Sequence, residues 1–386
     1  MRDTARAVVI GGGVGGCSIL YWLARLGWDD VVLVERADLT SGSTFHSAGL
    51  VGQLRSSLSL TRMMMESVNL YRTLEAEVGL ETGWREVGSL RLASSEERME
   101  EIARQAGWAK TFGLPLELVS ADEAKRLFPP LSTNGVRGAA FLPTDGYIDP
   151  SQLTFALAEG ARRRGAELYT STRVTGIRLR GGRVAGILTE RGEIEAEVVV
   201  NAGGPWAMEI GELLGAPLPL VNQVNEVIRV RLPAAVGYPV PMVQEYIPGE
   251  EQAGYFRQDG PGSMIAGVHT YAALAEAGSA DPDDYRDSVA WGTRDEVARR
   301  VGNRLQVEGL RFEPGWAGLY PVSADGEYVV GPYAADPTIV ACGGFSGQGL
   351  IAAISVGPAA AEWIVFGEPR SLPGAAAWLP DRPGQR

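Results

Sequence analysis

Three glycines early in the chain, Gly11, Gly13 and Gly16, have the G-x-G-x-x-G spacing of turns that bind dinucleotides. A short apolar run precedes them, a helical pattern follows to about residue 26, and a second β-branched run ends in Glu35. In a strand–turn–helix–strand unit these glycines permit a tight turn, a close approach to a pyrophosphate and close helix packing. The helix N-terminus offers N–H groups to the phosphates. The pattern predicts a dinucleotide site, and a glycine-rich turn that binds nothing fits the flanking strands less well.

Two further features support a nucleotide site. Glu35 follows Gly11 at close to the offset of about 20 residues at which a carboxylate binds a ribose 2′-hydroxyl, and such an acid disfavours NADP. A second glycine-rich turn, GGFSGQG at 343–349, opens a long helical pattern. Small residues also follow the apolar run 198–200, where they would let a ligand approach the main chain.

Composition limits the classes of partner. The chain has 386 residues, which favours two domains, and its net charge of −12 disfavours nucleic acids, whose phosphates need a basic face. Cys17 and Cys342 fit no metal-binding spacing and no disulfide framework, so we expect a reducing, cytoplasmic setting. We see no export signal. The longest apolar tract, 350–366, contains Pro358 and Glu362, which indicates a packed helix and not a membrane span.

Hydrophobic periodicity separates two kinds of segment. Residues 1–80, 144–215 and 316–386 alternate strand and helix patterns. Residues 216–315 contain strand-like runs between Pro and Gly turns, and 81–143 contain a strand pattern at 84–93 and two helices with capping-box spacing. We therefore predict an α/β, Rossmann-like dinucleotide-binding domain in three pieces, with a discontinuous substrate domain on a mostly antiparallel sheet.

Local signals mark two further segments. Asp149 and Pro150 suit the N-cap and first position of a helix that reaches about residue 164. The C-terminal residues 374–386 are expected to be frayed.

Seven motifs together resemble the D-amino-acid-oxidase superfamily of flavin enzymes, and the resemblance extends from end to end. It is closest to dimethylglycine and sarcosine dehydrogenases and to the sarcosine oxidase β subunit. It implies FAD, not NAD, in a binding domain of the glutathione-reductase type. The motifs are 10–16, 34–36, 41–49, 145–150, 202–204, 316–320 and 344–349.

The resemblance also implies a set of cofactor-binding residues. Ser43 and Thr44 would line the flavin, Val174 would meet the adenine through its main chain, and 344–349 would face the isoalloxazine. A helix N-terminus there would stabilise negative charge on the reduced ring. The full set is Gly11, Gly13, Val14, Gly15, Glu35, Arg36, Ser43, Thr44, His46, Ala48, Gly49, Leu50, Val174, Ala202, Gly203, Trp206, Gly344, Phe345, Ser346, Gly347, Gln348 and Gly349.

His46 is one of only two histidines. In the dimethylglycine and sarcosine dehydrogenases a histidine in a similar run bonds covalently to the flavin 8α-methyl group. The resemblance therefore favours a covalent link through His46, with a non-covalent contact or a structural role as alternatives. Monomeric sarcosine oxidase attaches its flavin to a cysteine, and that position is Gly318 here, so no competing link is expected.

The substrate side is less specific. His269 and Tyr320 resemble active-site residues of monomeric sarcosine oxidase, where a histidine could accept the proton of the amine, and Tyr255 is a third catalytic candidate. The lysines that this enzyme uses for oxygen activation and carboxylate binding are replaced by isoleucines, at 265 and 351. A buried carboxylate needs a charged partner, so we expect Arg55 or Arg257 to bind it.

These features predict an FAD-dependent amine oxidoreductase. It would oxidise the C–N bond of a sarcosine-, dimethylglycine- or proline-type amino acid to an imine, by hydride transfer to flavin N5. A dehydrogenase with a protein or quinone acceptor is favoured over an oxidase that uses O2, because the oxygen-activating lysine is absent. The alternatives are a D-amino-acid or glycine oxidase, and an FAD-binding subunit or assembly factor with little turnover.

Two expectations concern the assembly. The large dimethylglycine and sarcosine dehydrogenases carry a C-terminal folate-binding region, and we expect none within these 386 residues. A homo-oligomer or a partner subunit remains open.

Overall fold

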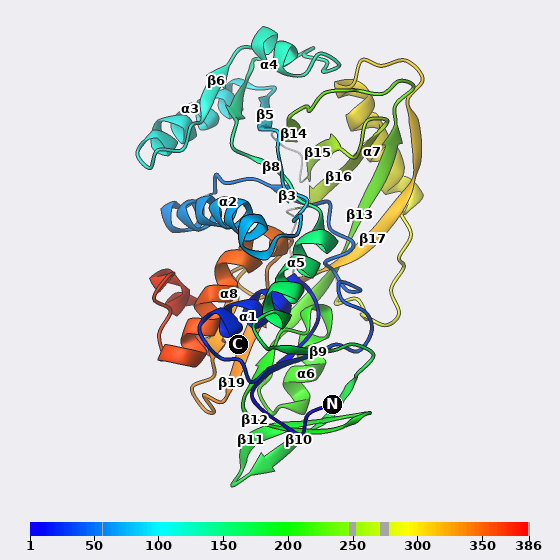
Figure 1. Cartoon of the computed structure of the whole chain (residues 1–386). Coiled ribbons are helices and arrows are strands. Elements are labelled where there is room, and N and C mark those ends of the chain that lie inside the picture. Colours follow the sequence, from blue (N-terminus) through cyan, green and yellow to red (C-terminus); the bar gives the residue numbers. More distant parts are fainter. Residues whose placement is uncertain (56, 247–251, 271–277, 385–386) are drawn as a thin grey trace.

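The computed structural model describes residues 1–55, 57–246, 252–270 and 278–384, with the main chain only at 252, 269 and 270. Figure 1 shows an elongated molecule, with one sheet and its helices towards one end and a second sheet towards the other.

The first sheet has the strand order β10-β11-β12-β1-β2-β9, and β19 pairs with both β12 and β18. β1 lies parallel between β12 and β2, and β19 is parallel to β12. Parallel strands end at one edge of a sheet, so the loops that follow β1, β2, β12 and β19 emerge side by side, where ligands bind in such folds. The strands are β1 (Thr4–Ile10), β2 (Val31–Val34), β9 (Glu167–Tyr169), β10 (Val174–Arg180), β11 (Arg183–Thr189), β12 (Gly192–Asn201), β18 (Val329–Pro332) and β19 (Ile339–Gly343).

Helices bury one face of this sheet. Ala7 and Val9 of β1 belong to the same core cluster as apolar residues of four helices, whereas Val8 and Ile10 belong to a cluster on the other face. This is the alternation expected of a strand covered on both sides. The four helices are α1 (Val14–Arg25), α2 (Leu58–Val78), α5 (Pro150–Arg162) and α8 (Gly349–Phe366), and α6 (Ala207–Leu213) contributes to the other face.

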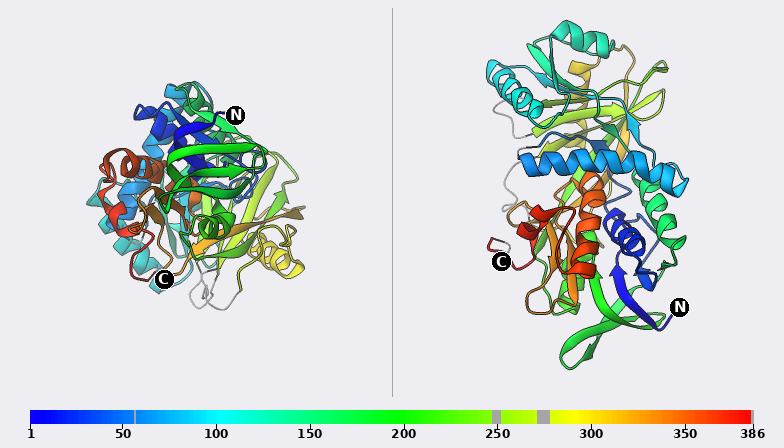
Figure 2. Two further views of the ribbon diagram at one scale, coloured as in Figure 1. Left: turned by 90° about the horizontal axis from the view of Figure 1, so that it is seen from below. Right: turned by 60° about the vertical axis from the view of Figure 1, so that its left-hand side comes forward.

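Helix α8 is the most apolar of the described helices. By length and composition it could cross a membrane, but 67% of that stretch is buried within the protein. A Cβ at Gly357 would lie 2.0 Å from Ser18 Oγ of α1, so the two helix backbones are in close contact. α8 therefore acts as a core helix here. The right-hand view of Figure 2 shows α2 lying crosswise between α8 and the second-sheet region.

The second sheet has eight strands in the order β17-β13-β16-β15-β14-β5-β7-β6, and every neighbouring pair except β14–β5 is antiparallel. The predicted boundary between 315 and 316 falls inside β17, which pairs with β13 from residue 311 to 323. One strand therefore serves both regions. The strands are β5 (Ser89–Ala93), β6 (Glu117–Val119), β7 (Gly138–Leu142), β13 (Leu220–Arg231), β14 (Met242–Tyr246), β15 (Gln252–Gln258), β16 (Ser263–Thr270) and β17 (Arg311–Ser323).

Short elements complete the fold around these two sheets. Asp149 caps α5 by accepting from the N–H groups of Ser151 and Gln152, and Pro150 occupies the first turn, as predicted. The remaining elements are the small sheet β3 (Leu50–Val51), β8 (Gly146–Tyr147) and β4 (Arg85–Glu86), with helices α3 (Glu96–Lys110), α4 (Ala121–Leu127) and α7 (Trp291–Arg304) and the 3₁₀ helices η1 (Gly204–Trp206) and η2 (Pro373–Trp378).

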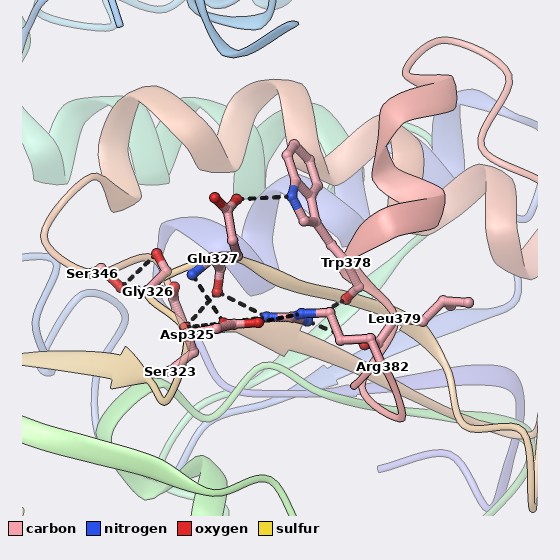
Figure 3. A network of polar contacts seen from close by, with 9 residues as sticks. Ser323, Asp325, Gly326, Glu327, Ser346, Trp378, Leu379 and Arg382 are labelled. Carbon is pink, nitrogen blue, oxygen red and sulfur yellow. Dashed lines mark hydrogen bonds and ion pairs between the residues drawn. The ribbon is translucent and has the colours of Figure 1, made fainter. Parts of the chain in front are cut away.

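The expectation of a frayed C-terminus is wrong for most of the segment. Figure 3 shows Arg382 reaching the turn between β17 and β18, where its Nε and Nη2 each donate to one Asp325 oxygen at 2.8 Å. The indole of Trp378 donates to Glu327 at 3.2 Å, and its ring packs on Tyr328. The bidentate ion pair and the buried indole order the segment, and neither is visible from local sequence patterns.

We expect Arg382→Gln to lower the thermal unfolding midpoint by roughly 1–3 °C at neutral pH. The Arg382 hydrogen bonds lower the pKa of Asp325. A carboxyl group whose pKa is lowered by folding stabilises the fold at pH values above its unfolded pKa of about 3.9. This stabilisation is lost as the pH falls through the pKa of the folded state. The difference between Arg382→Gln and wild type should therefore shrink below about pH 4.

Arg370→Gln is the matched control, because Arg370 pairs with Glu368 just before this segment and both side chains are more than half exposed. It should leave the midpoint nearly unchanged. Equal losses in both variants, measured by scanning calorimetry from pH 3 to pH 7, would contradict the role of Arg382.

Candidate functional site

The loops at the carboxyl edge of the first sheet enclose a cavity, here called the first cavity. Its walls come from the turn after β1, the end of β2, segment 41–44, residues 172–174, the turn after β12, the middle of β17 and the turn that opens α8. Sixteen of the predicted cofactor residues line it. They are Gly11, Gly13, Val14, Gly15, Glu35, Arg36, Ser43, Thr44, Val174, Ala202, Gly203, Trp206, Gly344, Phe345, Gly347 and Gly349.

Main-chain contacts explain the glycine spacing. Gly11 has φ +117°, and a Cβ on it would lie 2.3 Å from the carbonyl oxygen of Ala202. A Cβ on Gly16 would lie 2.0 Å from the carbonyl oxygen of Gly11. Real Cβ atoms do not approach oxygen so closely, so a side chain at either position would push α1 away from the sheet.

The first turn of α1 faces the first cavity. Gly13 is its N-cap and supplies no side chain, and the N–H of Val14 donates to Thr44 Oγ1 at 3.1 Å. The ring of Phe345 lies near Gly15, where a Cβ would approach it to 3.3 Å. A helix start that lines a cavity in this way suits a phosphate group.

Glu35 and Arg36 directly follow β2. The carboxylate of Glu35 accepts from the N–H of Gly12 at 2.6 Å and of Ala37 at 2.8 Å, which leaves lone pairs for ligand hydroxyls. Arg36 lies over the Trp206 ring and pairs with Asp283 at 2.9 Å, and the Trp206 indole also donates to Asp283. Asp283 therefore fixes two residues of the cavity wall, and no local sequence pattern marks it.

The second glycine turn is fixed by residues of β17 and of the segment between β17 and β18. The N–H of Ser346 donates to the carbonyl of Pro321 at 3.3 Å, and Tyr328 donates to Gln348 Oε1 at 2.7 Å. The ring of Tyr320 covers Gly347, where a Cβ would lie 2.5 Å from it. These contacts hold the start of α8 against the first cavity.

His46 lies beside the cavities and lines neither of them. Its Nδ1 is 2.9 Å from the carbonyl oxygen of Gly42, so Nδ1 carries the proton and Nε2 carries a lone pair. The indole of Trp316 donates to the His46 carbonyl at 2.8 Å. A Cβ at Gly318 would lie 2.4 Å from the Cβ of His46, so only glycine leaves room for the histidine.

A second cavity, of about 620 Å³, adjoins the first. Five predicted cofactor residues, Ala48, Gly49, Leu50, Ser346 and Gln348, line this cavity instead of the first. The two cavities share a boundary, so a planar ring at that boundary would face both. The shared residues are Ser47, Tyr320, Gly347 and Leu350.

Two guanidinium groups converge on one wall of the second cavity. Arg55 Nη1 and Arg91 Nη2 donate to the same carbonyl oxygen, that of Leu54, at 3.2 and 3.1 Å. A Cβ on Gly52 would lie within 3.7 Å of both groups and 3.6 Å from Asp145 Oδ2. Two positive groups thus stand near one carboxylate, which leaves this wall suited to an anion.

Asp145 is fully buried behind this wall. It accepts from Ser89 Oγ at 2.6 Å and from the Gln53 N–H at 2.8 Å. Burial raises the pKa of its carboxyl, while the charge of Arg91 lowers it. Sequence reasoning missed Arg91, although a charged residue in the middle of the apolar run 89–93 is a signal that could have identified it.

The residues predicted on the substrate side differ in whether they line a cavity. Tyr320 lines both cavities, and Arg55 lines the second. Arg257 lines neither, because its Nε donates to the carbonyl of Ala48 and its Nη1 to that of Gln258, and it is 6% exposed. This geometry does not fit the predicted carboxylate-binding role, because these donors already hold main-chain carbonyls.

Tyr255 is buried with its ring against Gly267, and it too lines neither cavity. Burial raises its pKa well above the ordinary value, so it is not suited to proton transfer near neutral pH. The main chain of His269 pairs with Ala253, but its side chain lies outside the described residues. Tyr320 is thus the catalytic candidate that the structure brings to the cavities.

Comparisons with known proteins agree with this site. The model of the family FAD dependent oxidoreductase (DAO) matches residues 6–363. Human mitochondrial dimethylglycine dehydrogenase is 30% identical over 382 residues, which cover 95% of this chain and 43% of that protein. Mouse mitochondrial sarcosine dehydrogenase is 40% identical over 232 residues, covering 57% of this chain and 25% of that protein. The chain thus spans less than half the length of these relatives.

A solved structure matches nearly the whole chain. The L-proline dehydrogenase of P. horikoshii superposes with a TM-score of 0.87 at 28% identity, covering 97% of this chain and 96% of that one. The glycine turns, the α1 N-terminus and Glu35 fit the pyrophosphate and ribose of FAD, and the boundary between the cavities fits its ring.

Gly16→Ala should abolish or weaken FAD binding at least tenfold, because its methyl group would meet the Gly11 carbonyl. Gly107→Ala is the control, since Gly107 is helical and a Cβ there meets nothing within 4 Å. The ratio of flavin to protein absorbance after purification, and FAD titration of the apoprotein, measure both. Normal FAD affinity in Gly16→Ala would contradict the assigned contact.

Proposed function

Since this chain belongs to the FAD-dependent oxidoreductase (DAO) family, we propose that it oxidises the C–N bond of a secondary or tertiary amino acid to an imine, which water hydrolyses. FAD accepts a hydride from the carbon next to nitrogen in such reactions. The observation that carries the proposal is the boundary shared by two cavities, one suited to FAD and one containing paired arginines. The relatives named for dimethylglycine, sarcosine and L-proline support a secondary or tertiary amine.

Arg55 and Arg91 would hold the carboxylate of the substrate. Their guanidinium groups already converge on one carbonyl oxygen, so little side-chain entropy is lost when an anion binds. Asp145 lies near Arg91 and offsets one of the two positive charges of this wall. This arrangement replaces Arg257 as the proposed clamp.

Tyr320 would orient the amine, because its side chain borders both cavities. The proposal that His269 accepts the amine proton rests on sequence alone. Neutral amine is the reactive form, so a proton acceptor near the boundary would raise the rate near neutral pH.

We further propose that His46 bonds covalently to the flavin. The support is the Nδ1 contact with Gly42, which leaves the Nε2 lone pair as a nucleophile, and Gly318, which offers no competing side chain. Gly318 and His46 are in direct contact.

The denatured protein should then carry the mass of one FAD and remain yellow after acid precipitation. His46→Asn should bind FAD that acid releases, because the nucleophile is gone while the rest of the first cavity is unchanged. Colourless wild-type protein with all of its flavin in the acid supernatant would refute the covalent link.

A dehydrogenase is favoured over an oxidase. Lysine occurs only at 110 and 125, in α3 and α4, and Ile265 occupies the predicted position of the oxygen-activating lysine. Rapid air oxidation of the reduced enzyme with stoichiometric peroxide would reverse this choice.

Arg55→Gln should raise the concentration of sarcosine needed for half-maximal flavin bleaching about 10- to 100-fold, because a charged hydrogen bond to the carboxylate is lost. An N-methylalkylamine without a carboxylate should be oxidised equally by wild type and by Arg55→Gln. Anaerobic stopped-flow absorbance measures both.

Arg257→Gln is the comparison variant, because its donors hold Ala48 and Gln258. It should lower stability without a selective effect on carboxylate-bearing substrates. If Arg257→Gln selectively lost activity on carboxylate-bearing substrates and Arg55→Gln did not, Arg257 would be the residue that binds the carboxylate.

A further inference from the structure

The second cavity has another polar wall besides the one with the arginine pair. This wall, here called the far wall, consists of one face of α3 and the end of β14, which pairs with β5. The residues on it are strongly polar. They are Arg98, Glu101, Gln105, Gln244, Glu245 and Tyr246.

The volume exceeds what the smallest amino acids require. A water-sized group takes about 30 Å³ in a liquid, so the six non-hydrogen atoms of sarcosine need less than about 200 Å³. The second cavity has about 620 Å³. A substrate held at Arg55 and Arg91 therefore leaves the far part of the cavity for another substituent.

Arg98 is the cation of the far wall. Its side chain is 14% exposed, and its guanidinium lies 5.5 Å from the centre of the Tyr246 ring. Nη1 donates to Glu101 at 2.5 Å, whereas the buried Nε has no hydrogen-bond partner among the described residues. Its Nη2 makes no hydrogen bond among the described residues and is not among the buried atoms, so it retains donor capacity that a carboxylate in the cavity could use.

The nearby acids oppose Arg98 only in part. Glu245 is neutralised by Arg304, which donates to both of its oxygens. Glu101 pairs with Arg98, but its side chain is 41% exposed, so water screens the pair. Gln105 already donates to the other oxygen of Glu101. A second anion at Arg98 would therefore be repelled by one carboxylate, that of Glu101, whose charge is screened by water.

We infer that the substrate is a secondary or tertiary amine with a carboxylate on each of two arms. One carboxylate binds Arg55 and Arg91, and the arm on the other side of the nitrogen carries its carboxylate towards Arg98. This inference rests on the proposed function and specifies its substrate class. Arg98 determines specificity and has no part in the chemical step.

The test compares iminodiacetate, which has two carboxylates, with sarcosine, which has one, by anaerobic flavin bleaching of the holoenzyme. Wild type should favour iminodiacetate at least tenfold in the second-order rate constant of flavin reduction. Arg98→Gln should lower this preference at least tenfold while sarcosine oxidation stays unchanged. Glu101→Gln should raise the preference, because it removes the opposing charge.

Arg104→Gln is the matched control, since Arg104 is also on α3 but is 69% exposed and pairs with Glu100. It should leave the rate constants of flavin reduction by iminodiacetate and by sarcosine unchanged. Opposite shifts in Arg98→Gln and Glu101→Gln cannot arise from a structural role of the ion pair, because breaking the pair would then have the same effect in both.

The outcomes separate this inference from the proposed function. Bleaching by sarcosine with no preference for iminodiacetate, or equal losses for both amines in Arg98→Gln, would overturn the second carboxylate site alone. No bleaching by any amino-acid amine would overturn the proposed function itself.

Discussion

The close packing of the first glycine turn against the end of β12 is the contact on which the site depends. Gly11 approaches the Ala202 carbonyl, and Gly16 approaches the Gly11 carbonyl, at distances that no side chain permits. This contact sets α1 flat on the sheet, so that its first turn points into the first cavity. The second glycine turn, from Gly344, reaches the same cavity from the opposite end of the chain.

A continuous strand joins this nucleotide-binding edge to the substrate side. β17 pairs with β13 in the second sheet, and its residue Tyr320 covers Gly347 of the second glycine turn. The two cavities therefore meet at a boundary that combines Tyr320 of the strand β17 and Leu350 of the helix α8 with the loop residues Ser47 and Gly347. Rigid support at the meeting point is what hydride transfer requires, because reacting atoms must be held within a short distance.

Two walls of the second cavity carry arginine side chains. The wall with Arg55 and Arg91 has one positive charge in excess over Asp145, and the far wall has Arg98 beside a screened acid. The net charge of −12 conceals this arrangement, since it sums over the whole surface. Only the cavity walls matter to a bound anion, because burial strengthens electrostatic interactions there.

Local sequence patterns were enough to predict the glycine turns and the acid of the nucleotide-binding edge. Glycine spacing, the acid directly after β2 and the capping residues Asp149 and Pro150 act over short stretches, so local patterns were sufficient. A sequence resemblance added the identity of FAD, which the match to the family supports. The walls of the second cavity and the order of the C-terminus depend instead on contacts that form only in the folded chain. Arg91, Asp145 and Arg382 meet partners far away in the chain, and no local periodicity records such long-range contacts.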